Sequence, residues 1–186
     1  TTTQNWITLE GCKLALKSDV NYNNGDYISP PEKGLKAFSR NYTSTLFDKE
    51  GYEEDLHLSL FDGFENTESY LNYMDAFFGS IDANDLLGML NTWQMGDIGK
   101  HQKFNNNTKE ALANINCPAL VMPSSTDLSF PARNNIPEVK EMPKAELRVI
   151  NTKYGHLAGG MSTALTSQED VTFIDKNIKE FLKKIT

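Results

Sequence analysis

Apolar residues recur every three or four positions between residues 30 and 93, and they fall into three stretches. This spacing places the apolar side chains of each stretch on one face of a helix. Pro30-Pro31 favours a helix start, and Asn23-Asn24-Gly25-Asp26 has the composition of a turn. The pattern predicts a run of amphipathic helices with core positions at Leu35, Phe38, Tyr42 and Leu46; at Tyr70, Met74, Phe77 and Ile81; and at Leu86, Leu87, Leu90 and Trp93.

The chain changes character after this helical run. Residues 96–108 lose the periodicity and are rich in Gly, Lys, His and Asn, which predicts a surface loop. Two short apolar runs follow, at residues 119–122 and 147–150, and each is typical of a strand buried on both faces. Between them, residues 131–142 predict one or two helical turns broken at Pro137. The order strand, helix, strand indicates a parallel α/β unit.

The last stretch predicts a helix that packs on the rest of the chain. Ser167, followed by Glu169 and Asp170, has the composition of a helix amino terminus. One apolar stripe follows, and lysines gather toward the carboxyl end, where the helix dipole favours them. The residues of the stripe are Val171, Ile174, Ile178, Phe181, Leu182 and Ile185.

Two parallel strands cannot alone form a sheet with both faces covered, because each leaves backbone groups unpaired along an edge. We therefore expect an α/β fold whose sheet is completed by residues outside this chain. Three parts are predicted: an amino-terminal segment (1–19), a run of helices with the loop that follows it (20–108) and a carboxyl-terminal α/β segment (109–186). The first residues lack an initiator Met and the features of a signal peptide, so we expect a further portion upstream of Thr1.

Composition excludes several classes of partner. The net charge is -7, from 18 Lys and Arg against 25 Asp and Glu, which argues against nucleic-acid binding. No stretch approaches the roughly 20 apolar residues that cross a bilayer, so we expect no membrane partner. Cys12 and Cys117 match neither a metal pattern nor a disulfide framework, which favours reduced thiols and a cytoplasmic location. We expect no metal and no cofactor.

Candidate chemistry lies just beyond the two predicted strands. Asp127 follows the first strand and His156 follows the second, and sites in open α/β sheets collect at the carboxyl ends of strands. An acid followed by a base is the chain order of the Ser, Asp, His triad in α/β-hydrolases. The alternative is that Asp127 caps the helix near Pro131 and that His156 is a turn residue between glycines.

Other residues are weaker candidates. Ser124, Ser125 and Ser129 lie near Asp127, but none sits on a strand-to-helix elbow, and the sequence has no Gly-x-Ser-x-Gly. His57 and His101 have no second ligand at metal spacing, so a solvated or packing role is expected for both. The nucleophile of a triad would therefore lie outside this chain.

Several motifs resemble, in order, those of the carboxyl-terminal half of the homoserine O-acetyltransferase family of α/β-hydrolases. The resemblance covers nearly the whole chain, and it implies that residues 1–19 leave the core sheet, that residues 20–108 form a helical lid and that residues 109–186 are a carboxyl-terminal core segment. The segments that carry it are Gln4-Asn5-Trp6, Gly25-Asp26-Tyr27, 31–35, 82–86, 92–98, 120–127, 145–148 and Gly155-His156.

The resemblance implies an acyl transfer centred on a serine. Asp127 and His156 match the acid and the base of that family, whereas its nucleophilic serine and oxyanion-hole donors lie upstream of the matched region. The expected partners are this upstream portion and a small ester or acyl donor, with acyl-CoA as a candidate co-substrate. Members of the family also suggest a homodimer formed through the lids.

Leu157 departs from the pattern of the family's homoserine-using transferases, which have an acidic residue after the catalytic His. An apolar residue at this position suits an uncharged acceptor. We therefore favour an esterase, hydrolase or O-acyltransferase related to the family over homoserine O-acetyltransferase proper. A non-catalytic binding or scaffold module that retains the fold is the alternative from another class.

Overall fold

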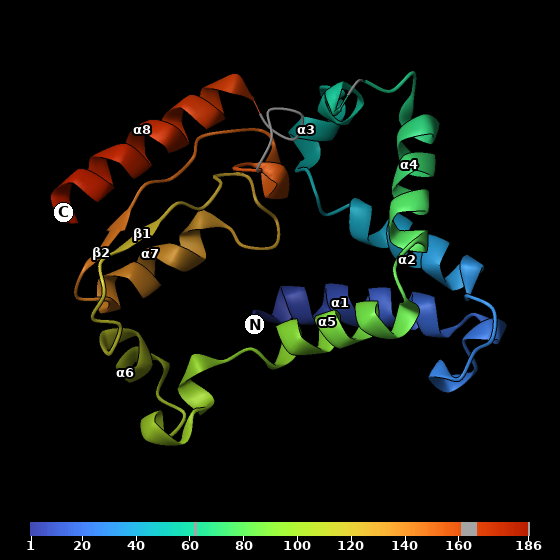
Figure 1. Cartoon of the computed structure of the whole chain (residues 1–186), viewed down its shortest axis with the longest axis horizontal. Coiled ribbons are helices and arrows are strands. Elements are labelled where there is room, and N and C mark those ends of the chain that lie inside the picture. The colour runs from blue at the N-terminus through green and yellow to red at the C-terminus, as the bar shows by residue number, and fades with distance from the viewer. Residues whose placement is uncertain (62, 161–166, 186) are drawn as a thin grey trace. The chain divides into compact units, whose positions relative to one another are not determined.

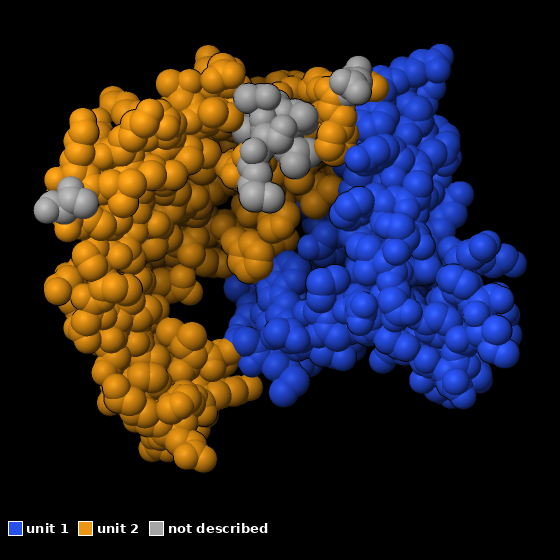
Figure 2. Space-filling model, viewed as in Figure 1, with its two compact units in different colours: residues 1–45, 64–96 blue, residues 46–63, 97–186 orange. Residues whose placement is uncertain are grey.

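The computed structural model describes residues 1–61, 63–160 and 167–185, and it combines many helices with a two-stranded parallel sheet (Figure 1). The chain divides into two compact units (Figure 2). Unit 1 comprises residues 1–45 and 64–96, and unit 2 comprises residues 46–63 and 97–186. The predicted domain boundaries after residues 19 and 108 stay a prediction, because these units group residues only by contacts within this chain.

Unit 1 is built from helices. Helix α1 packs against α2 and α5, and α2 packs against α4. Helix α2 begins directly after Pro31, as the sequence predicts. Side chains of Thr2, Asn66 and Asp82 accept hydrogen bonds from the first backbone N–H groups of the helices that follow them, which satisfies donors that the helix leaves free. The elements are α1 (Thr3–Lys17), η1 (Val20–Gly25), α2 (Glu32–Thr43), α4 (Thr67–Gly79) and α5 (Ala83–Met95), with η denoting a 3-10 helix.

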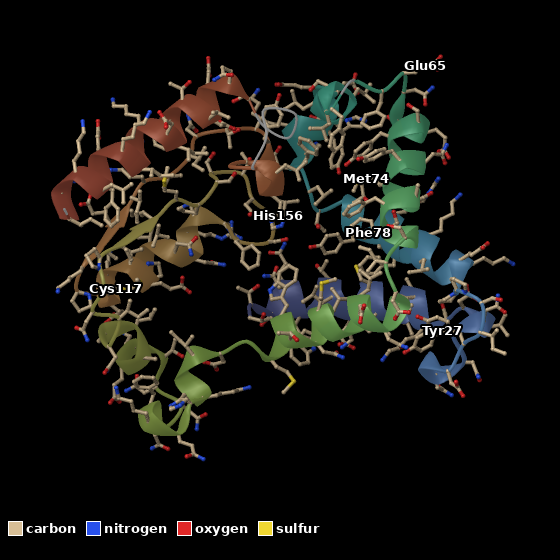
Figure 3. All side chains as sticks on the ribbon, viewed as in Figure 1. Tyr27, Glu65, Met74, Phe78, Cys117 and His156 are labelled. Carbon is tan, nitrogen blue, oxygen red and sulfur yellow. The ribbon has the colours of Figure 1, made fainter. Side chains whose placement is uncertain are left out.

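The core of unit 1 contains most of the apolar positions that the periodicity predicts. One position is wrong: the Phe77 side chain is 52% exposed, and Phe78 is buried instead. Tyr70, Met74 and Phe78 are spaced by four residues and share one face of α4, on which Figure 3 labels Met74 and Phe78. Phe78 packs edge-to-face on Phe38. The buried apolar side chains of unit 1 include Leu9, Leu16, Leu35, Phe38, Tyr70, Met74, Phe78, Leu86, Leu87 and Leu90.

Unit 2 contains the sheet. Strands β1 and β2 pair in parallel, with Leu120 opposite Glu146. The N–H of Ile150 donates to the carbonyl of Pro123 at 2.9 Å. Proline has no backbone N–H, so Pro123 cannot donate a hydrogen bond to the neighbouring strand, and the regular ladder ends before it. The predicted second strand at 147–150 is therefore wrong in its bounds. The elements are α3 (Lys49–Glu53), η2 (Leu56–Ser59), η3 (Ile98–Lys100), η4 (Gln102–Phe104), α6 (Thr108–Ala113), β1 (Ala119–Val121), α7 (Ala132–Glu141), β2 (Ala145–Leu147), η5 (Gly155–Leu157) and α8 (Gln168–Ile185).

Two further predictions need correction. Helix α7 is not broken at Pro137: it spans ten residues, Ala132–Glu141, and Pro137 lies inside it. A proline there removes one N–H donor, and the helix absorbs the loss of that single bond. The predicted loop at 96–108 contains the short 3-10 helices η3 and η4. The amino terminus of α8 agrees with its prediction, because the N–H of Asp170 donates to Ser167 Oγ at 3.0 Å.

The sheet and α8 leave apolar surface open within the described residues. All residues of β1 and β2 are only partly buried. The α8 side chains Ile178, Leu182 and Ile185, which belong to the predicted apolar stripe, are 42%, 49% and 46% exposed. None of the helices in the described ranges has the length and apolar character that a membrane crossing requires.

Candidate active site

Asp127 lies in the loop between β1 and α7, and its side chain is largely buried. Its Oδ1 atom accepts hydrogen bonds from the N–H groups of Ser129 at 2.7 Å and Phe130 at 2.9 Å. Both donors precede α7, whose N-cap residue is Pro131 and which has no side-chain cap. Asp127 therefore does not cap α7, and the alternative reading of this residue is wrong. Instead, the local bonds fix one carboxylate oxygen and leave the other to point elsewhere.

His156 lies on η5, in the segment between β2 and α8 (Figure 3). Its Nδ1 atom is 3.0 Å from Oδ2 of Asp127, which is hydrogen-bond distance. The ring of Phe130 lies beside the imidazole, with 5.7 Å between the ring centroids. The structure thus brings together the two residues that the sequence singles out. Their catalytic role stays a prediction.

Residues 46–48 fix the turn that carries His156. The N–H of His156 donates to the carbonyl of Leu46 at 2.8 Å. Gly155 has a φ of +53°, and an added Cβ would lie 2.5 Å from Leu46 O and 2.9 Å from the Cα of Phe47. Only glycine combines this backbone conformation with so close an approach to another backbone. The glycine before His156 therefore sets the position of the His156 side chain.

Replacing Gly155 by alanine should lower the free energy of unfolding of the protein by about 2–4 kcal/mol, because the change adds both backbone strain and overlap. Urea denaturation measures the loss. Gly88→Ala in α5 is the matched control, since no atom lies within 4 Å of its added Cβ. That variant should be as stable as the parent protein or more stable. Equal urea midpoints for the two variants would contradict the close approach at Gly155.

Asp127 is ionised at neutral pH. Burial alone would raise the pKa of Asp127, but the hydrogen bond from His156 and the N–H groups of Phe130 and Ser129 outweigh it and hold the pKa below its ordinary value. The stability that these bonds contribute is therefore present at neutral pH and is lost as the pH falls through the lowered pKa. An ionised carboxylate at Nδ1 keeps the proton on that atom and leaves Nε2 as a proton acceptor.

The remaining candidates have structural surroundings. His57 is buried beside the Tyr52 ring, and burial lowers its pKa, in agreement with the expected packing role. His101 is exposed, and its Nδ1 accepts from the N–H of Lys103. Burial raises the pKa of Cys12 to about 11, which makes this thiol unreactive. Within residues 1–61, 63–160 and 167–185, no three His, Cys, Asp or Glu side chains are grouped so that they could hold a metal ion.

The side chains of Ser124 and Ser125 form hydrogen bonds to loop residues. The N–H of Thr126 donates to Ser124 Oγ at 3.3 Å, and Ser125 Oγ donates to the carbonyl of Thr152 at 3.2 Å.

The sequence did not predict two contacts of the site: the Phe130 ring beside His156, and the threonine hydroxyls that join the two loops. Motif spacing gives no signal for either, because each depends on how the loops meet.

Comparisons with known proteins show which proteins this chain is similar to. The chain is 32% identical over 185 residues, 98% of its length, to a probable esterase of Corynebacterium glutamicum. It is 30% identical over 146 residues, 77% of its length, to ethyl acetate hydrolase of Pseudomonas veronii, and 26% identical over 152 residues to homoserine O-acetyltransferase of Chloroherpeton thalassium. The chain spans about half the length of the curated relatives it matches, 51% for the first of these. No protein-family model matches the chain.

Solved structures show the same relationship. An acetylester hydrolase from Corynebacterium glutamicum superposes with a TM-score of 0.86 at 30% identity, over 98% of this chain and 51% of that chain. The acetyl esterase MekB gives a TM-score of 0.82 at 26% identity, over 94% of this chain and 51% of that one. The fold is therefore that of the carboxyl-terminal half of an α/β-hydrolase, as predicted. Within this class, the chain is related to the homoserine O-acetyltransferase family and to acetylester hydrolases, which confirms the resemblance carried by its motifs.

Proposed function

We propose that this chain is the carboxyl-terminal part of a serine-dependent acyl-transfer enzyme, in which Asp127 is the acid and His156 the base. One observation carries the proposal: the 3.0 Å contact between two side chains that follow β1 and β2. By this proposal the nucleophilic serine and the oxyanion-hole donors belong to a portion outside residues 1–186. The support for that portion is the share of about half that the chain covers in its relatives.

The proposed reaction needs no cofactor. His156 Nε2 accepts the serine proton while the serine Oγ attacks the ester carbonyl, and Asp127 stabilises the resulting imidazolium. When the tetrahedral intermediate collapses, the bond to the alcohol breaks and the alcohol takes the proton from Nε2, which leaves an acyl-enzyme. Water or an acceptor alcohol then gives its proton to His156, attacks the acyl carbon and releases the acyl product, and the serine regains its proton.

The substrate we favour is a short acetyl ester of an uncharged alcohol, with water as the acceptor. The relatives named as ethyl acetate hydrolase and acetylester hydrolase support this choice. The apolar Leu157 next to the base in the sequence and the Phe130 ring beside the imidazole support it also. Homoserine O-acetylation from acetyl-CoA is the second candidate, because homoserine O-acetyltransferases are among the relatives.

A labelling experiment on the full-length protein tests the proposal. A fluorophosphonate should modify one serine, which peptide mass analysis should place outside residues 1–186, and the protein should hydrolyse ethyl acetate to acetate and ethanol. Incubation with acetyl-CoA and homoserine should give no O-acetylhomoserine, and its formation would favour the second candidate. A protein that is neither labelled nor active on either substrate would be a non-catalytic module, and the proposal would be wrong.

A further inference from the structure

The loops that carry Asp127 and His156 are joined one residue before each of these side chains. Thr126 Oγ1 accepts the N–H of Gly155 at 3.1 Å, and the next residues along both loops are the acid and the base. Gly155 lies 29 residues after Thr126, and His156 lies 29 residues after Asp127, so the two contacts are in register. A shift of Gly155 relative to Thr126 would therefore move His156 relative to Asp127.

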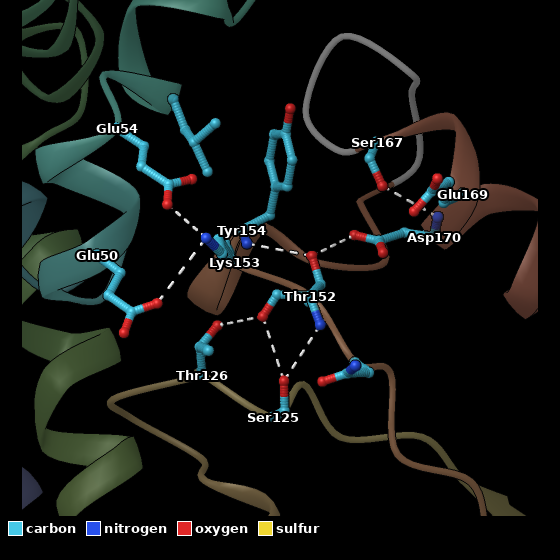
Figure 4. Close-up of a pocket in the computed structure, with 12 residues that line it drawn as sticks. Glu50, Glu54, Ser125, Thr126, Thr152, Lys153, Tyr154, Ser167, Glu169 and Asp170 are labelled. Atoms are coloured by element: carbon cyan, nitrogen blue, oxygen red, sulfur yellow. Dashed lines mark hydrogen bonds and ion pairs between the residues drawn. The ribbon is translucent and has the colours of Figure 1, made fainter.

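Thr152 fastens the same two loops at a second point (Figure 4). Its carbonyl accepts from Thr126 Oγ1 at 2.9 Å, and its N–H donates to Ser125 Oγ at 3.1 Å. Its own hydroxyl accepts the N–H of Tyr154 at 3.1 Å, which bends the chain directly before the 3-10 turn of His156. Thr152 thus contacts both the acid loop and the start of the base turn.

Asp170 gives Thr152 a fixed support on α8. The Thr152 hydroxyl donates to Asp170 Oδ2 at 2.6 Å, and Asp170 is only 4% exposed. Asp170 lies in the first turn of α8, where unpaired N–H groups and the helix dipole favour a carboxylate, and its own N–H is bonded to Ser167. The support is therefore a helix terminus and not another loop.

Each of the two threonine hydroxyls donates one hydrogen bond and accepts another. A hydroxyl has a single proton to donate, and Thr126 and Thr152 each donate it to a defined oxygen while accepting a backbone N–H. Losing either hydroxyl would remove a donor from one oxygen and an acceptor from one backbone N–H at the same time. Coupled bonds of this kind hold a geometry more strictly than single contacts do.

We propose that Asp170, Thr152 and Thr126 form a positioning relay that sets the distance between the acid and the base. The relay touches neither substrate nor the reacting atoms, and it acts only through the Asp127–His156 contact. The catalytic part of this inference rests on the proposed function. The geometric part, that the hydroxyls maintain the contact, can be measured independently of activity.

Threonine-to-valine changes in the full-length protein test the relay. Thr126→Val and Thr152→Val should each lower kcat for ethyl acetate about tenfold with KM changed less than twofold, because substrate contacts remain. Thr126→Ser and Thr152→Ser keep the hydroxyl and should stay within threefold of the parent. Thr172→Val is the matched control, since this exposed hydroxyl donates to the Gln168 carbonyl within α8, and it should leave kcat unchanged.

A double-mutant cycle separates positioning from a general structural role. In an Asp127→Ala background the contact is already lost, so Thr126→Val should change kcat less than twofold further. A hydroxyl that merely stabilises the fold would lower kcat by the same factor in both backgrounds. That equal factor would overturn the relay.

A spectroscopic measurement keeps the test valid if the protein has no esterase activity. The His156 Nδ1–H bonded to Asp127 should give a low-field proton resonance, assigned by its absence in His156→Gln. The resonance should persist in Thr126→Ser and be lost or exchange-broadened in Thr126→Val. An inactive parent protein would refute the proposed function while this signal still decides the geometry. An unchanged resonance in the valine variants would overturn the relay even in an active enzyme.

Discussion

Replacing His156 by glutamine in the full-length protein should lower kcat for ethyl acetate by about 10³- to 10⁴-fold and abolish fluorophosphonate labelling. Glutamine has a similar size and can still bond to Oδ2 of Asp127, 3.0 Å from His156 Nδ1 in the parent. It cannot accept a proton from a serine hydroxyl. The loss would therefore report proton transfer and not the collapse of the loop.

The control for this variant is His101→Gln, because His101 is an exposed histidine of the same unit. It should retain both full labelling and full activity. Thermal unfolding of the two variants should differ little, since the glutamine at 156 keeps the turn at Gly155. Labelling of His156→Gln at the parent rate would contradict the assignment of His156 as the base.

Periodicity predicts the helices of this chain better than its strands. The stripes around Leu35, Tyr70 and Leu86 locate α2, α4 and α5 because a helix repeats its face every three to four residues. The error at Phe77 arises because two adjacent phenylalanines both fit a helical face, and only packing against Phe38 selects Phe78. Such a choice depends on the partner helix and not on local spacing.

The strands are short, and apolar runs alone do not define their ends. The run at 147–150 contains Ile150, which forms an isolated bridge with Ser124, yet β2 ends at Leu147. The limit comes from Pro123 on the neighbouring segment, which cannot donate to the ladder. Strand bounds are therefore set by a residue on the other strand, and single-segment reasoning does not reach it.

The candidate site was predictable at the level of its two main side chains. Asp127 and His156 follow the strand ends, where the topology of a parallel sheet brings side chains together, and the structure places them in contact. The supports of the site were not predictable. The close approach of Gly155 to Leu46 joins segments far apart in the sequence, and the Thr126 and Thr152 hydroxyls look like ordinary loop residues in the printed sequence.

The Asp127→Asn variant should lose about 10⁴-fold in kcat, although it changes almost no volume. The reason lies in how the carboxylate is held. Ser129 and Phe130 donate two N–H groups to Oδ1, so an asparagine at this position would keep its carbonyl oxygen there. Its NH₂ group would then face Nδ1 of His156, which would have to become an acceptor. The ring proton would move to Nε2, and the imidazole could no longer accept a proton from serine.

Asp127→Ala is the comparison that isolates this tautomer effect. Alanine also removes the negative charge, but it leaves His156 free to carry its proton on Nδ1. The alanine variant should therefore be about tenfold more active than the asparagine variant, although it departs further from the parent in size. Steady-state hydrolysis of ethyl acetate by both full-length variants measures the difference. If asparagine is as active as alanine or more active, the Ser129 and Phe130 N–H groups do not fix the orientation of the residue at position 127.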